Sequence, residues 1–196
     1  VINFNAQELI SWAFQEFGAH DVLLASSLGA EDQVLTQMVT ALAKDARIFT
    51  LDTGRQFQEN YDVMSESQLK YNFSYELCFP DALAVNELVQ EKGPNLFYNS
   101  IQDRKSCCEV RKMAPLRKKL QSGKIWITGL RADQSVTRTN MQAIEWDHNF
   151  GLYKLNPLIL WSEDEIWEYI KDQDIPYNAL HDQGYPSIGC RPCTRA

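Results

Sequence analysis

The stretch Asp21-Val22-Leu23-Leu24-Ala25-Ser26-Ser27-Leu28-Gly29-Ala30-Glu31-Asp32 decides the fold of this chain. Residues 21–26 form a short apolar run, which predicts a buried strand, and residues 31–44 repeat apolar positions at helical spacing. Small residues before a helix leave backbone N–H groups free where the helix dipole favours an anion. The stretch therefore predicts a strand, an anion-binding loop and a helix, although helix capping alone would explain the same small residues.

The same alternation of helix and strand continues along the chain. Helices are expected from the cap at Asn5 to Phe17, over residues 58–70, and after a capping box at residues 162–165. Buried strands are expected at residues 47–51, 74–79 and 124–128. Such a pattern predicts an α/β fold with a mostly parallel sheet and helices on both faces. With 196 residues and no repeat, residues 1–196 are most simply a single domain.

Composition excludes several classes of protein. Hydrophobic residues make up 44% of the chain and charged residues 23%, which argues against disorder. No apolar stretch approaches the roughly 20 residues that span a membrane, and the first residues lack the charged start of a signal peptide. The formal net charge of −7 argues against a general nucleic-acid binder. We therefore expect a soluble, cytoplasmic protein with neither a membrane nor a nucleic-acid partner.

Four of the five cysteines fall into two tight pairs, Cys107-Cys108 and Cys190-Arg191-Pro192-Cys193. Four thiolates at one point can hold a metal centre. Adjacent cysteines are unusual for zinc and reach a bulky cluster only if the backbone bends or the pair sits at a helix start, which favours an iron–sulfur cluster over zinc. Buried thiols or disulfides are the alternatives. Cys78 ends an apolar run and is expected to be a buried strand residue.

Positive charge gathers around the first cysteine pair. Arg111 and Lys112 follow the cysteines by three to five positions, so that a helix would bring them to the same side. A cation there would offset the charge of an anionic cluster and attract an anionic substrate. For residues 117–119 a solvated helix face is the simpler interpretation.

Three polar loops follow predicted strands, and ligands of open α/β sheets bind at the carboxyl ends of the strands. They are residues 26–32, residues 51–55 and residues 129–138. The first is neither a Walker loop nor a dinucleotide fingerprint. The second carries Asp52, Thr53, Gly54 and Arg55, and a turn with a capping side chain is its simpler interpretation. In the third, two arginines can clamp a phosphate or a sulfate, whereas a lone arginine would more often be a surface charge.

Together these segments resemble the assimilatory adenylyl-sulfate reductases of the phosphoadenylyl-sulfate reductase family. The resemblance rests on residues 27–32, 51–55, 107–112, 129–131 and 189–196, which occur in the order of the family. It implies an adenine-nucleotide alpha-hydrolase-like fold related to the PP-loop ATP pyrophosphatases. It also implies reduction of adenosine 5′-phosphosulfate to sulfite and AMP, through an enzyme S-sulfocysteine, with thioredoxin or glutaredoxin as the electron donor.

The resemblance also assigns residues. Members with both cysteine pairs carry a 4Fe–4S cluster, so its ligands here would be Cys107, Cys108, Cys190 and Cys193. Lys112 matches the family lysine between cluster and substrate. Substrate binding would fall to Ser26, Ser27, Gly29, Asp52, Thr53, Gly54 and Arg55. Arg131 or Arg138 would hold the phosphosulfate, and spacing does not choose between them.

One departure concerns the nucleophile. The family nucleophile lies in a C-terminal tail with a Glu-Cys-Gly-type motif, which is absent from this chain and would lie beyond Ala196. The alternatives are a reductase of the 3′-phosphorylated substrate, or a PP-loop-type nucleotide-binding module without reductase activity. A Ser-Gly-Gly loop would favour a pyrophosphatase, but Leu28 and Glu31 stand in its place. The protein could also form a homo-oligomer, and a plant member would be plastidial.

Overall fold

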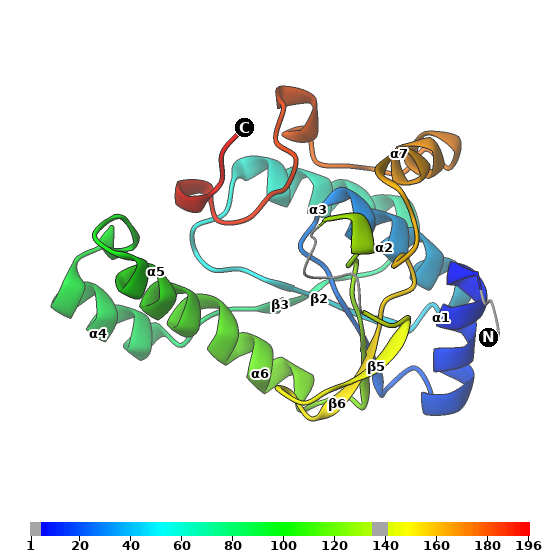
Figure 1. Ribbon diagram of the computed structural model, residues 1–196, viewed down its shortest axis with the longest axis horizontal. Helices are drawn as coiled ribbons and strands as arrows, with labels where there is room; N and C mark the ends of the chain where they lie inside the picture. Colours follow the sequence, from blue (N-terminus) through cyan, green and yellow to red (C-terminus); the bar gives the residue numbers. More distant parts are fainter. Residues whose placement is uncertain (1–4, 135–140) are drawn as a thin grey trace.

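The computed structural model describes residues 5–134 and 141–196. One six-stranded sheet runs through the middle of the molecule in the order β3-β2-β1-β4-β6-β5 (Figure 1). Its strands are β1 Val22–Ala25, β2 Arg47–Leu51, β3 Glu76–Cys78, β4 Ile125–Ile127, β5 Ile144–Asp147 and β6 Leu152–Leu155. Every neighbouring pair is parallel except β5 with β6. The predicted mostly parallel α/β sheet is confirmed, with an antiparallel hairpin at one edge.

The central strand β1 fixes the register of its neighbours. Leu24 pairs with Ile48 of β2 on one side and with Ile127 of β4 on the other. Because all three strands run in the same direction, their carboxyl ends reach one edge of the sheet together. The loops that follow these strands are therefore neighbours in space, although the loops after β1 and β4 lie about a hundred residues apart in the chain.

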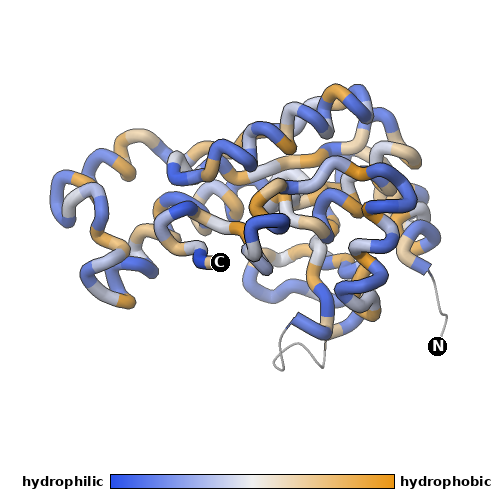
Figure 2. Tube along the Cα trace, turned by 90° about the horizontal axis from the view of Figure 1, so that it is seen from above, coloured by the Kyte–Doolittle hydropathy of each residue, from blue (hydrophilic) through white to orange (hydrophobic). Residues whose placement is uncertain are grey.

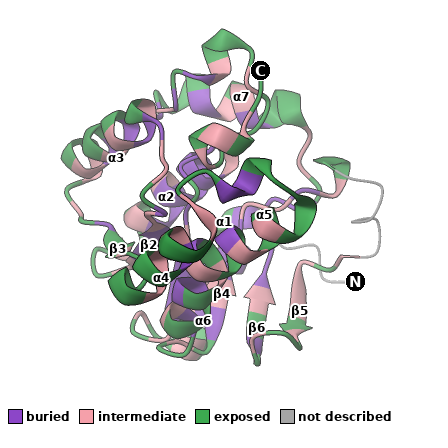
Figure 3. Ribbon diagram, turned by 90° about the vertical axis from the view of Figure 1, so that its left-hand side faces the viewer, coloured by how far each residue is buried: buried purple, intermediate pink, exposed green. Residues whose placement is uncertain are grey.

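Helices cover both faces of the sheet, as predicted. The helices are α1 Ala6–Phe17, α2 Ala30–Leu42, α3 Gln58–Tyr71, α4 Ala82–Lys92, α5 Ile101–Cys108, α6 Ala114–Leu120 and α7 Glu163–Asp172. Side chains of α1, α2, α3 and α7 join the core on one face, and those of α6 pack on the other. Helices α4 and α5 extend beyond the sheet at the left of Figure 1. Buried residues concentrate on the strands and on the helix sides that face them (Figure 3).

The two faces follow from the period-two alternation of β1. Leu24 belongs to the core under α1 and α2, whereas its neighbour Leu23 packs with Phe49 and Leu116 under α6. Each fully buried side chain of this size contributes about 1.5–3 kcal/mol. Hydrophobic and hydrophilic positions also alternate along the helices (Figure 2), so each helix has one side for the core.

Local signals in the sequence set several helix boundaries. Asn5 caps α1, as predicted, and completes a capping box with Glu8; the predicted capping box of Ser162 and Glu165 opens α7. The expected helix at residues 31–44 ends two residues earlier, at Leu42. The expected strand at residues 74–79 is regular only over Glu76–Cys78. Among the described residues, the structure shows no helix with the length and apolar character needed to cross a membrane.

Buried amides tie the C-terminal segment to the helices. Gln33 of α2 donates to the hydroxyl of Ser67 at 2.5 Å and to the carbonyl of Pro176 at 2.8 Å. Asn178, which is fully buried, donates to the amide oxygen of Asn60 in α3 at 2.8 Å. Its own amide oxygen accepts from the backbone of Leu180 at 3.0 Å. These bonds place the segment that carries the second cysteine pair over the sheet edge.

We predict that Asn178→Ala lowers the free energy of unfolding by about 2–3 kcal/mol, because it leaves buried groups on Asn60 and Leu180 unpaired. Urea denaturation measures the loss. Asn149→Ala, at an exposed position of the β5–β6 turn, is the matched control and should change stability by less than about 0.5 kcal/mol. Equal losses in the two variants would contradict a structural role for the buried amides.

Candidate active site at the carboxyl edge of the sheet

A cavity of about 400 Å³ opens where β1, β2 and β4 end. This volume lies in the range of small-molecule sites. The walls come from the loop after β1, the end of β2 and its loop, the end of β4, the start of α6 and the C-terminal segment. The polar and charged groups of the wall include Ser26, Ser27, Glu31, Asp32, Thr50, Thr53, Gln56, Lys112, Thr128, Gln134, His181, Ser187 and Cys190.

The structure brings only part of the predicted substrate set to this cavity. Ser26, Ser27, Gly29, Thr53 and Lys112 line it. Asp52, Gly54, Arg55 and Arg131 lie in the same loops but outside the lining, and Arg138 falls outside the described residues. The roles of all these residues in substrate binding stay predictions.

Asp32 organises the loop after β1. Its carboxylate accepts from the backbone N–H and the hydroxyl of Ser27, both at 2.6 Å, while the hydroxyl of Ser26 accepts from the N–H of Leu28. Burial raises the pKa of Asp32 to about 6, against the opposing effect of the bonds from Ser27. The donors of Ser27 are therefore occupied. An anion at this loop must use the first free N–H groups of α2, which begins at Ala30.

The loop after β2 acts as a junction. The Asp52 carboxylate accepts from Tyr61 at 2.9 Å and from the N–H of Gly54 at 2.8 Å, which fits the turn that was the simpler interpretation. Gly54 has φ +69°, a conformation that other residues rarely adopt. The Arg55 guanidinium binds the carbonyl of Pro94 and lies 5.4 Å from the centre of the Phe97 ring. The backbone carbonyl of Arg55 accepts from Arg191 at 2.8 Å, which joins this loop to the second cysteine pair.

Arg131 is buried, and the half-buried Glu31 neutralises it. Its Nε lies 2.9 Å from the carboxylate of Glu31, and its side chain is only 6% exposed. Gln134 donates to the same carboxylate oxygen at 2.8 Å. This pair joins the start of α2 to the loop after β4. Arg131 therefore holds two loops of the site together, and its charge is already balanced in the structure.

The first cysteine pair sits where the helix changes its winding. Cys107 and Cys108 end α5, and the chain continues through a wider π-helical turn, η2 Glu109–Met113, into α6. The pair lies at the end of α5 and not at a helix start, and the helix winding changes directly after it. Turns of this kind occur frequently at functional sites.

The two cysteine pairs lie within electrostatic range of one another. Burial raises the pKa of the Cys107 thiol, Arg111 lowers it, and the charges of Cys108, Cys190 and Cys193 raise it. Cys190 also lies 3.2 Å from the hydroxyl of Thr53 in the cavity wall. All five cysteines are free thiols. The fold thus brings four soft sulfur donors from distant parts of the sequence to one region, a donor set that suits iron–sulfur clusters and zinc alike.

The side chains are not arranged as a finished metal site. Within residues 5–134 and 141–196, no group of three or more His, Cys, Asp or Glu side chains is placed to hold an ion. The donor chemistry and the surrounding charge nevertheless fit an anionic cluster. Arg111 is buried beside Cys107 and donates to the carbonyl of Thr53 at 2.8 Å. The expectation that Arg111 and Lys112 lie on the side of the cysteines is met for Arg111, while Lys112 reaches the cavity.

Sequence reasoning missed the apolar part of the wall and most of the C-terminal part. Phe49, Leu116 and Trp126 contribute from one face of the sheet, and His181 contributes from the turn η5 His181–Gln183. The strand residues read as ordinary core. A lone histidine in an irregular segment gives no periodic signal, so only the fold could place it.

Comparison with known proteins now places the chain. Residues 21–196 match the model of the phosphoadenosine phosphosulfate reductase domain. The adenosine 5′-phosphosulfate reductase of Allochromatium vinosum is 46% identical over 97% of this chain and 74% of its own length. The enzyme of the same name from Burkholderia cepacia is 44% identical over 90% of this chain and 71% of its own length.

Solved structures agree on the fold. A phosphoadenylyl-sulfate reductase from Candida auris superposes with a TM-score of 0.83 at 24% identity, covering 99% of this chain and 92% of the other. An FMN adenylyltransferase from Candida glabrata gives a TM-score of 0.63 at 15% identity, covering 95% of this chain and 61% of the other. These likenesses show that the chain shares its fold with both proteins. From the matching domain model and the curated relatives together, the chain belongs to the phosphoadenosine phosphosulfate reductase family.

Proposed function

We propose that this protein reduces adenosine 5′-phosphosulfate to sulfite and AMP in sulfate assimilation, with electrons from a dithiol. Relatives at 38–46% identity carry the name of that activity. One observation in the structure supports it most directly. A single cavity runs from the loop after β1 to Lys112 and Cys190, so a nucleotide and the cysteine region share one space.

The cavity wall offers a flexible cation, which suits the negative charge of a phosphosulfate. Among the described residues that line the cavity, Lys112 is the one lysine, and no arginine is present. Lys112 forms no ion pair with the described part of the chain. Its ammonium group can offset the charge that develops on the leaving phosphate. Free N–H groups at the start of α2 add a second anion-binding element.

The reaction proceeds in two steps, each of which begins with attack by a thiolate. A cysteine thiolate attacks the sulfur of the phosphosulfate, the sulfur–oxygen bond to phosphate breaks, and AMP leaves. A dithiol such as thioredoxin or glutaredoxin then attacks the S-sulfocysteine, releases sulfite and becomes a disulfide. The resemblance assigns the nucleophilic cysteine to a Glu-Cys-Gly-type motif, which residues 1–196 do not contain. The residues described here bind the substrate and hold its charge.

Cys107, Cys108, Cys190 and Cys193 would hold a 4Fe–4S cluster. When bound, such a cluster would add fixed charge beside the substrate. Arg111, buried next to Cys107, would balance that charge from the protein side. Zinc on the same four thiols is the competing assignment.

Reduction of the 3′-phosphorylated substrate is the second candidate, since the family model carries that name. Binding and turnover of the two nucleotides distinguish the candidates. Sulfite release from adenosine 5′-phosphosulfate in the presence of thioredoxin, with little from the 3′-phosphorylated form, would support the proposal. Nucleotide binding without sulfite release would indicate a binding module instead.

We predict that Lys112→Ala weakens the affinity for adenosine 5′-phosphosulfate by about tenfold or more, because the cavity loses its free cation. Calorimetric titration measures the affinity. Lys118→Ala, an exposed lysine of α6 away from the lining, is the matched control and should bind as the unaltered protein does. Equal affinity in all three proteins would remove Lys112 from the site.

We predict that Cys190→Ser, purified without oxygen, loses most of its iron and acid-labile sulfide, because a hydroxyl is a poor substitute for a thiolate ligand. The unaltered protein should contain about four irons and four sulfides per chain and absorb broadly near 400 nm. Cys78→Ser, at the unpaired cysteine of β3, is the control and should keep the full content. One zinc and no iron in the unaltered protein would refute the cluster and keep the four-thiol site.

A further inference from the structure

Two described residues of the cavity wall carry a buried polar atom without a partner. Three buried side-chain nitrogen or oxygen atoms in the described part of the chain have no hydrogen-bond partner, namely Tyr71 Oη, Trp126 Nε1 and His181 Nε2. Trp126 and His181 both belong to the cavity wall, and Tyr71 does not. A buried polar atom without a partner costs about 1–3 kcal/mol, so each instance needs an explanation. A ligand bound in the cavity would explain why both residues keep an unpaired atom.

The state of His181 follows from its other nitrogen. Nδ1 lies 2.9 Å from the backbone carbonyl of Tyr185. A carbonyl oxygen only accepts hydrogen bonds, so Nδ1 must carry the proton of the neutral ring. Nε2 then presents a lone pair and acts as an acceptor. The fixed tautomer tells us which kind of ligand group this atom can recognise.

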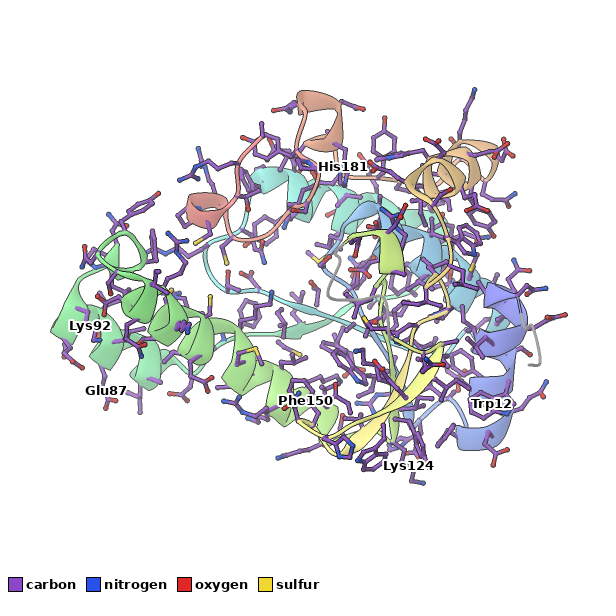
Figure 4. All side chains as sticks on the ribbon, in the orientation of Figure 1. Trp12, Glu87, Lys92, Lys124, Phe150 and His181 are labelled. Atoms are coloured by element: carbon purple, nitrogen blue, oxygen red, sulfur yellow. The ribbon has the colours of Figure 1, made fainter. Side chains whose placement is uncertain are left out.

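The ring is also held in place. Trp167 of α7 packs against it edge-on at 5.2 Å between ring centres, and a flip would break the bond to Tyr185. The backbone N–H of His181 donates to the carbonyl of Asn178 at 3.0 Å, which ties the turn to the buried amides. Figure 4 shows His181 at the upper side of the molecule, on the segment that crosses the sheet edge. His181 also contributes to a neighbouring cavity beside Trp167 and Tyr177, so it belongs to the partition between the two.

We propose that His181 Nε2 accepts a hydrogen bond from the nucleotide bound in the main cavity, which makes His181 a specificity-determining residue. The proposal rests on the proposed function, because that function supplies the ligand. Phosphate and sulfate groups of an adenosine nucleotide offer only acceptors at neutral pH. Its donors are the two ribose hydroxyls and the exocyclic amine of adenine. The partner of His181 is therefore one of these nucleoside donors and not the phosphosulfate.

Substitutions can separate the two nitrogens of His181. In His181→Asn the side-chain amide can still donate to the carbonyl of Tyr185, but nothing replaces the acceptor at Nε2. In His181→Gln the longer side chain can return an amide oxygen to the position of Nε2. Tyr71→Phe removes an equally unpaired atom away from the cavity and serves as the control.

The probes are AMP and three analogues that each lack one donor: 2′-deoxy-AMP, 3′-deoxy-AMP and purine riboside 5′-monophosphate. Dissociation constants are measured at pH 8, well above the ordinary titration range of imidazole. We predict that the unaltered protein binds one analogue about tenfold more weakly than AMP. His181→Asn should bind AMP about tenfold more weakly and lose discrimination against that analogue alone. His181→Gln should recover part of both, and Tyr71→Phe should behave as the unaltered protein.

The outcomes separate this proposal from the proposed function. If the unaltered protein fails to bind AMP and adenosine 5′-phosphosulfate, the function is wrong and the role of His181 falls with it. If AMP binds and His181→Asn keeps every ratio between AMP and its analogues, the function stands and the role of His181 is overturned. A general loss of affinity with unchanged ratios would show that His181 only supports the loop.

Discussion

The parallel pairing of β1 with both β2 and β4 is the constraint on which the site depends. It brings three loops to one edge, and the side chains then lock the loops together. Asp32 binds Ser27 and lies against the loop after β4, where a Cβ on Gly129 would come within 2.3 Å of its carboxylate. Only glycine fits this approach without displacing the carboxylate. The contact between the two loops thus depends on a residue without a side chain as much as on the acid that faces it.

Burying the Asp32 carboxylate at this contact lowers the stability of the fold when the group is ionised. Burial raises the pKa of Asp32 from 3.8 to about 6, so the folded chain holds the proton more tightly than an unfolded chain would. Ionising Asp32 therefore reduces stability as pH rises from about 4 to about 6, and the reduction remains above that range. The bonds from Ser27 only partly offset the desolvation. Retaining an ionised carboxylate at neutral pH makes sense if the positions of the two loops matter for the ligand.

The sequence predicted the helices and strands that follow from local patterns and missed those that depend on distant contacts. Continuous apolar runs predicted β1, β2 and β4, the cap at Asn5 predicted the start of α1, and the capping box at residues 162–165 predicted the start of α7. Helix α4 and the hairpin of β5 with β6 were not predicted, since they lack a strong apolar period, and helix around residues 107–119 was considered only from its charges. The loops of the site were found as stretches. Which side chain faces the cavity was not, because Asp52 turns to its own loop and Arg131 to Glu31. The choice at Arg131 depends on a partner a hundred residues away.

The arginines show why composition misleads about this site. Arg55 binds the carbonyl of Pro94, Arg111 that of Thr53, and Arg131 the carboxylate of Glu31. Each planar guanidinium is thereby fixed as a structural cross-link between segments. Lys112 differs, because its side chain is exposed and reaches the cavity wall. An ammonium group on a flexible stem can follow negative charge as it moves from the sulfur group to the leaving phosphate. A guanidinium held by its own partners cannot do this. The arginines therefore serve as cross-links, and Lys112 is the group that can respond to the charge of the substrate.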